Sequence, residues 1–151
     1  MKRHISILVA ALCLATVGCG GDSGEPDGHG HHHSGDGEHD HYTPGMERLT
    51  DAGLFEVAFY SEPAPTVGLH QFMLSIRDAM TEAPVEGATI AVDLSMPDHG
   101  HGSDRVPVVE VDGPGIYRVE NVSLHMMGIW QIDLTIEAEA GTDTVTFRFD
   151  V

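Results

Sequence analysis

Basic residues are the scarcest class in this chain of 151 residues. Seven Lys and Arg stand against 24 Asp and Glu, which gives a formal net charge of −17. Nucleic-acid binding needs a basic surface that neutralises phosphates, and attraction to anionic lipid needs the same charge. The composition therefore excludes nucleic acid as a partner and any basic patch that would hold the chain on a lipid surface.

Cysteine is nearly absent as well, and so are the common catalytic motifs. The two cysteines, Cys13 and Cys19, both lie near the start of the chain, so we expect neither a disulfide nor a thiolate ligand in the folded part. The sequence has no Gly-x-Ser-x-Gly elbow, no Gly-rich phosphate loop and no His-Glu-x-x-His helix. We therefore expect a protein that is not an enzyme.

No apolar run is long enough to span a bilayer, but a short one follows a basic start. Ile5 to Val17 has the length of the apolar region of a signal peptide. The next residues, Thr16-Val17-Gly18-Cys19, resemble a bacterial lipobox. The resemblance implies a signal peptide over 1–18, a lipid on Cys19 and a cell-envelope location. Because Gly20 follows the cysteine, the outer membrane, facing the periplasm, is favoured if the cell has two membranes.

Residues 19–49 read as a disordered linker that is rich in Gly, His and acidic residues. Such a composition cannot bury enough apolar surface to offset the entropy of ordering. Dense histidines interleaved with carboxylates bind divalent metals loosely. The alternative is a solvated linker whose histidines bind nothing specific. The histidines of this linker are His29, His31, His32, His33, His39 and His41.

From residue 50 to 151 the apolar residues alternate with polar ones. Trp130, Ile132, Leu134 and Ile136 give the clearest example, with polar residues between them. This period of two indicates strands of antiparallel sheets packed face to face. Seven short strands fit the segment, which predicts an all-β fold: a seven-stranded antiparallel immunoglobulin-like sandwich.

Several short motifs in this segment resemble the YtkA-like/FixH-like domain, a small β-sandwich of bacterial exported and membrane-bound proteins. The motifs, in order, are Gly68-Leu69-His70-Gln71-Phe72, Met96-Pro97-Asp98-His99-Gly100-His101-Gly102, Gly115-Ile116-Tyr117 and Met127-Gly128-Ile129-Trp130. FixH-like members are linked to the assembly of copper-containing oxidases, and the fold is similar to that of periplasmic copper carriers. The resemblance therefore implies an envelope protein that handles copper.

If each strand reverses the direction of the last, the loops at 61–68, 96–104 and 123–127 share one end of the sandwich. These loops hold the candidate metal ligands, and His70 begins the next strand near the same end. Thioethers favour Cu(I), whereas imidazoles serve Cu(II), zinc and nickel. The candidate ligands are His99, His101, His125, Met96 and Met126, with His70 as a weaker candidate.

Structural roles remain open for several of these residues. His70 shares the phase of Phe72 and fits a buried, hydrogen-bonded core position, and Met96-Pro97 fits the end of a strand. Met127 fits core packing. The histidines at 99 and 101 lie in a Gly-rich polar loop where packing requires neither.

Two functions are compatible with these features. The first is a lipid-anchored, envelope-facing module that binds copper as Cu(I) or Cu(II), with zinc as second choice. The second is an interaction module that docks to an envelope or respiratory-oxidase assembly complex, with histidines that bind no metal.

Overall fold

The computed structural model describes residues 40–151. The predicted signal peptide, the predicted lipidation site Cys19 and the histidines from His29 to His39 lie outside the described residues. Within this range the chain forms strands and no helix, and so no helix long and apolar enough to cross a membrane occurs there. The strands are β1 (Met46–Leu49), β2 (Phe55–Ser61), β3 (Gly68–Asp78), β4 (Thr89–Met96), β5 (His101–Gly102), β6 (Val108–Gly113), β7 (Ile116–Leu124), β8 (Ile129–Ala138) and β9 (Gly141–Asp150).

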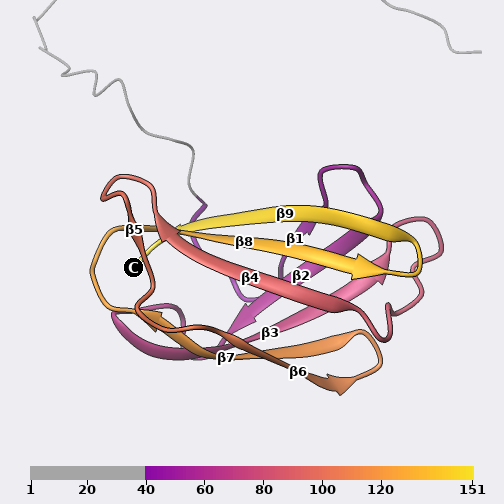
Figure 1. Ribbon diagram of the computed structural model, residues 1–151, viewed down its shortest axis with the longest axis horizontal. Helices are drawn as coiled ribbons and strands as arrows, with labels where there is room; N and C mark the ends of the chain where they lie inside the picture. The colour runs from indigo at the N-terminus through magenta and orange to yellow at the C-terminus, as the bar shows by residue number, and fades with distance from the viewer. Residues whose placement is uncertain (1–39) are drawn as a thin grey trace, which may run out of the picture. The chain divides into compact units, whose positions relative to one another are not determined.

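The strands, labelled in Figure 1, form two antiparallel sheets. One sheet has the order β1-β2-β3-β7-β6, and the other has the order β5-β4-β8-β9. The predicted all-β sandwich is confirmed. The seven predicted strands correspond to β2, β3, β4, β6, β7, β8 and β9, while β1 and β5 are additional. The strand β1 and the residues just before it lie in the segment that the sequence assigns to the linker, so the sandwich begins before residue 50.

The core lies between the sheets and is made by the alternating apolar residues. In β8 the side chains of Trp130, Ile132, Leu134 and Ile136 are all buried. From β2 and β9, Phe59 and Phe147 meet across the sheets with ring centroids 5.1 Å apart. Each large apolar side chain that is fully buried contributes about 1.5–3 kcal/mol relative to exposure. This core is complete without a disulfide.

A buried carboxylate fastens the β1–β2 loop to β9. Asp143 accepts hydrogen bonds from the backbone amides of Ala52, Leu54 and Thr144. Burial opposes the ionisation of Asp143, but these bonds and one from Thr50 outweigh it and lower the pKa to about 2. The carboxylate therefore stays charged at all but strongly acidic pH.

The register of the strands brings several loops to one end of the sandwich. Gly68 at the start of β3 pairs with Leu124 at the end of β7, and Ser95 near the end of β4 pairs with Gln131 near the start of β8. The β4–β5 hairpin, the β7–β8 loop and the end of β9 meet at this end, on the left of Figure 1. We call it the histidine pole, since it holds His99, His101 and His125. The connections at the opposite end, 79–88, 114–115 and 139–140, contain no histidine.

Candidate metal centre

A tight hairpin at the end of β4 positions the first two histidines. After Met96 the chain turns back, and the amides of His99 and Gly100 both donate to the Met96 carbonyl at 3.1 and 3.0 Å. Gly100 adopts φ +68°, a conformation that glycine takes without strain. His101 then pairs with Met96 in the β4–β5 ladder. The hairpin thus holds His99 at its tip and His101 on its returning arm.

The β7–β8 loop adds the third histidine to form a row of imidazoles. The ring centroids of His99 and His101 are 5.7 Å apart, and those of His101 and His125 are 5.5 Å apart. An ion bonded at about 2.0–2.1 Å to one nitrogen of each ring places two centroids roughly 5 Å apart. The rings of His99, His101 and His125 are therefore neighbours, whereas the sequence predicts that His70 joins them as well. Their binding of metal remains a prediction.

The three rings are neighbours, but they do not form a finished coordination sphere. In residues 40–151 no three His, Cys, Asp or Glu side chains are arranged to hold an ion as they stand. All three histidines are exposed, so their side chains can rotate without disturbing the core. Closure on an ion therefore requires only rotation of surface side chains and movement of their loops.

Trp130 contacts His125 and anchors the loop that carries it. Its side chain is fully buried, and its indole Nε1–H donates to the carbonyl of Met126 at 2.9 Å. The ring of His125 stands edge-on to the indole at a centroid distance of 5.4 Å. From the sequence, Trp130 was expected only as a core residue of a strand. Its Nε1–H also fixes the loop that carries His125 and Met126.

The methionines of the pole differ in exposure. Met96 ends β4 with 0% of its surface exposed, which agrees with the structural role that the sequence left open. Met126 and Met127 are 38% and 77% exposed, so Met127 does not pack in the core. The thioether of Met96 is thus shielded from solvent, whereas the side chains of the other two methionines reach it.

Gly128 lies beside both Met96 and His99. A Cβ placed on Gly128 would lie 3.1 Å from Met96 Cε and 3.7 Å from His99 Nε2. The backbone of Gly128 is fixed by two hydrogen bonds of 3.0 Å with Val151, one in each direction. The side chains of Met96 and His99 therefore face the same small space beside a glycine that cannot easily shift.

His70 does not join the row. Its Nε2 lies 2.6 Å from the carbonyl oxygen of Thr66, and its ring stacks on Phe72 at 6.2 Å. The side chain is half-buried rather than part of the core. These contacts hold the ring of His70, near the start of β3, against the β2–β3 loop and favour a structural role.

Asp104, which no sequence pattern singles out, is an acidic residue near His125. The hydroxyl of Ser123 donates to the Asp104 carboxylate, and this bond, with the nearby His125 and Arg105, lowers the pKa of Asp104. The neighbouring Arg105 donates to the Asn121 side chain at 3.2 Å. These contacts fasten the β5–β6 loop to β7 and bring a negative charge close to His125. Nothing in the sequence distinguishes Asp104 from the many other acidic residues.

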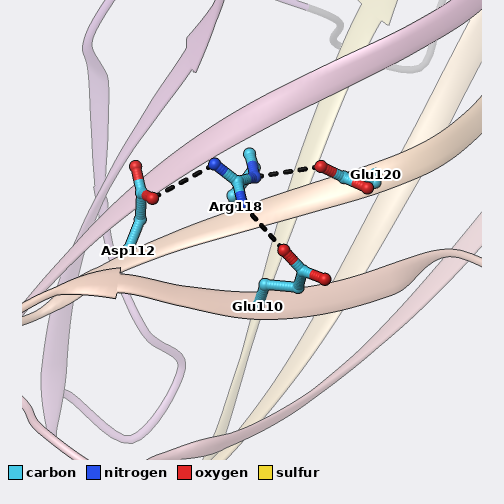
Figure 2. A network of polar contacts seen from close by, with 4 residues as sticks. All are labelled: Glu110, Asp112, Arg118 and Glu120. Atoms are coloured by element: carbon cyan, nitrogen blue, oxygen red, sulfur yellow. Dashed lines mark hydrogen bonds and ion pairs between the residues drawn. The ribbon is translucent and has the colours of Figure 1, made fainter.

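A second polar cluster, away from the pole, has a structural explanation. Figure 2 shows three carboxylates around the Arg118 guanidinium: Glu110 at 2.7 Å, Asp112 at 3.1 Å and Glu120 at 3.0 Å. The hydrogen bond that Arg118 donates to Glu110 and the charges of all three carboxylates raise the pKa of Arg118. The cluster ties β6 to β7, and its carboxylates are paired with a cation rather than arranged for catalysis.

Comparisons with known proteins agree with this architecture. A copper-bound variant of FetP from uropathogenic Escherichia coli has a TM-score of 0.51 at 15% identity, covering 73% of this chain and 91% of its own. FetP from the same source, as isolated, also has a TM-score of 0.51, at 14% identity, covering 73% of this chain and 95% of its own. No curated protein matches the chain. The YtkA-like family model matches residues 50–135, more than half of the sequence, and so the chain belongs to the YtkA-like family.

Proposed function

We propose that the chain is a cell-envelope protein that binds copper at the histidine pole. The observation that carries the proposal is the row of His99, His101 and His125, whose adjacent ring centroids are 5.5–5.7 Å apart. The three imidazoles are exposed, and they come from the β4–β5 hairpin and the neighbouring β7–β8 loop. Their spacing suits ligands that share an ion, and imidazole is a ligand for copper.

The similarity to FetP supports copper over other ions. A solved FetP structure is described as copper-bound, and its fold resembles the one seen here. The buried Met96 and the exposed Met126 add thioethers, which select Cu(I) rather than zinc. A lipid on Cys19 would hold the sandwich at the membrane, and the linker histidines would capture metal loosely before it reaches the pole. The proposed activity is binding rather than catalysis.

Metal titration of the full chain tests the proposal. Cu(I), Cu(II) and Zn(II) are added in competition with a chelator to the wild type and to a His99→Ala/His101→Ala/His125→Ala variant. The matched control replaces five linker histidines, His29, His31, His32, His33 and His39, by serine. We expect one tight copper equivalent that the triple variant loses and the linker variant keeps. A tight equivalent that survives in the triple variant, or its absence from the wild type, would overturn the proposal.

The alternative, docking to an envelope complex, has one observation in its favour. Three valines on and before the edge strand β6 are exposed: Val106, Val108 and Val111. Apolar side chains gathered at an unpaired sheet edge are typical of protein contacts. If the wild type binds no copper, this edge becomes the candidate functional surface.

A further inference from the structure

The backbone of Gly128 has a conformation and a position that few residues can adopt. Its φ is +126°, where a side chain is strained. Its amide and carbonyl are both bonded to Val151, so the residue is held from the β9 side of the loop. A side chain added at this position could not be accommodated by movement of the backbone without breaking that pair of bonds.

The side of Gly128 that lacks a side chain faces two candidate ligands. A Cβ there would be 3.1 Å from Met96 Cε, which is closer than ordinary van der Waals contact, and 3.7 Å from His99 Nε2. Met96 is fully buried, so its thioether does not reach solvent. An ion that enters the space left by the missing side chain would have both Met96 and His99 beside it.

We propose that Gly128 is a specificity-determining residue of the histidine pole. By leaving this space open, Gly128 lets an ion held by His99 also meet the thioether of Met96. A thioether adds affinity for Cu(I) but little for Zn(II), which is served by nitrogen, oxygen and thiolate ligands. Gly128 thereby makes the pole prefer Cu(I). This inference rests on the proposed function.

The experiment compares Gly128→Ala with Gly68→Ala in the full chain. Gly68 is a matched control, because it also lies at the pole with a strained φ of +145° but has no atom within 4 Å of an added Cβ. Affinities for Cu(I) and Zn(II) are measured by chelator competition. We expect Gly128→Ala to lower the Cu(I) affinity about tenfold, the scale of a change beside a metal ligand, with little change for Zn(II). Gly68→Ala should leave both affinities near the wild-type values.

A double-mutant cycle tests whether Gly128 acts through Met96. Met96→Leu keeps the volume of the buried side chain but removes the sulfur, so it should lower the Cu(I) affinity to a similar extent. Adding Gly128→Ala to Met96→Leu should then cause no further loss. An equal loss of Cu(I) and Zn(II) affinity in Gly128→Ala would overturn the inference, because it would indicate general distortion of the loop.

The outcomes separate this inference from the proposed function. A wild type that binds no copper defeats the proposed function and the inference with it. A wild type that binds Cu(I) tightly, while Gly128→Ala behaves like Gly68→Ala, leaves the proposed function intact and refutes the role of Gly128 alone.

Discussion

Replacing Trp130 by phenylalanine should weaken both the fold and the metal site. The change removes the hydrogen bond from Nε1 to the Met126 carbonyl, which is worth about 1 kcal/mol. The smaller ring also leaves a cavity in the core, at a cost of about 1–2 kcal/mol. The free energy of unfolding should therefore fall by about 2–3 kcal/mol, and Tm by roughly 10 °C for a domain of this size.

The same substitution should lower copper affinity about tenfold, because the loop that carries His125 loses its support. The control is Tyr117→Phe, near the opposite end of the sandwich. The Tyr117 hydroxyl donates to the Val85 carbonyl at 2.7 Å and accepts from the Ala88 amide at 3.0 Å. Its loss leaves two polar groups unpaired and costs about 1–3 kcal/mol without touching the pole.

Urea unfolding followed by circular dichroism gives the stabilities, since the chain has a single tryptophan and Trp130→Phe removes the fluorescent probe. Chelator competition gives the copper affinities. The reasoning is refuted if Trp130→Phe binds copper as tightly as the wild type. It is refuted equally if Tyr117→Phe loses as much affinity, because the effect would then follow stability rather than the support of His125.

Three further results are expected. Cu(II) should quench the fluorescence of Trp130, whose ring lies 5.4 Å from that of His125, whereas Zn(II), a closed-shell ion, should not; a fluorescence titration of the wild type checks this. Asp143→Ala should lower the urea midpoint near neutral pH. The folded-state pKa of Asp143 is about 2, below the ordinary 3.8, so its contribution to the free energy of unfolding is complete above about pH 4 and is lost as the pH falls towards 2. The difference in urea midpoint between variant and wild type should therefore shrink over that range. His70→Ala should leave copper affinity unchanged, since the ring is engaged with Thr66 and Phe72; a clear loss in chelator competition would make His70 a ligand.

Strands with strict alternation could be predicted from the sequence, and the two that were missed lack it for physical reasons. In β1 one inward position belongs to Arg48, whose guanidinium lies 5.9 Å from the centre of the Phe147 ring. The aliphatic part of an arginine side chain can cover a core while its charged group reaches solvent. Because arginine counts as polar in the sequence, the alternation of apolar and polar residues is not visible in β1. The strand β5 has two residues, too few for any period. It approaches β4 closely because Gly102 has no side chain, since a Cβ there would lie 2.3 Å from the Leu94 carbonyl oxygen.

The candidate site was predictable to the extent that topology alone determines it. Counting strand reversals is enough to bring His99, His101 and His125 together, because loops alternate between the two ends of an antiparallel sandwich. Counting strand reversals shows at which end of the sandwich a residue lies, but not how far apart two side chains are. It therefore groups His70 with the other three histidines, although the His70 ring is bonded to Thr66. The bond from Ser123 to Asp104 depends on a side-chain contact between β7 and the β5–β6 loop, which no local sequence pattern encodes.

If the pole binds copper as proposed, its burial pattern favours an ion that is exchanged rather than kept. A structural metal usually substitutes for a missing core, and its site folds only with the ion bound. Here the core between the sheets is formed by apolar side chains alone, with Trp130 and Met96 fully buried beneath the loops. The three histidines lie outside that core and are exposed, so ligands from another protein could reach an ion that they hold. The buried residues would then set the position and the metal preference of the site, while the exposed imidazoles would allow the ion to enter and leave.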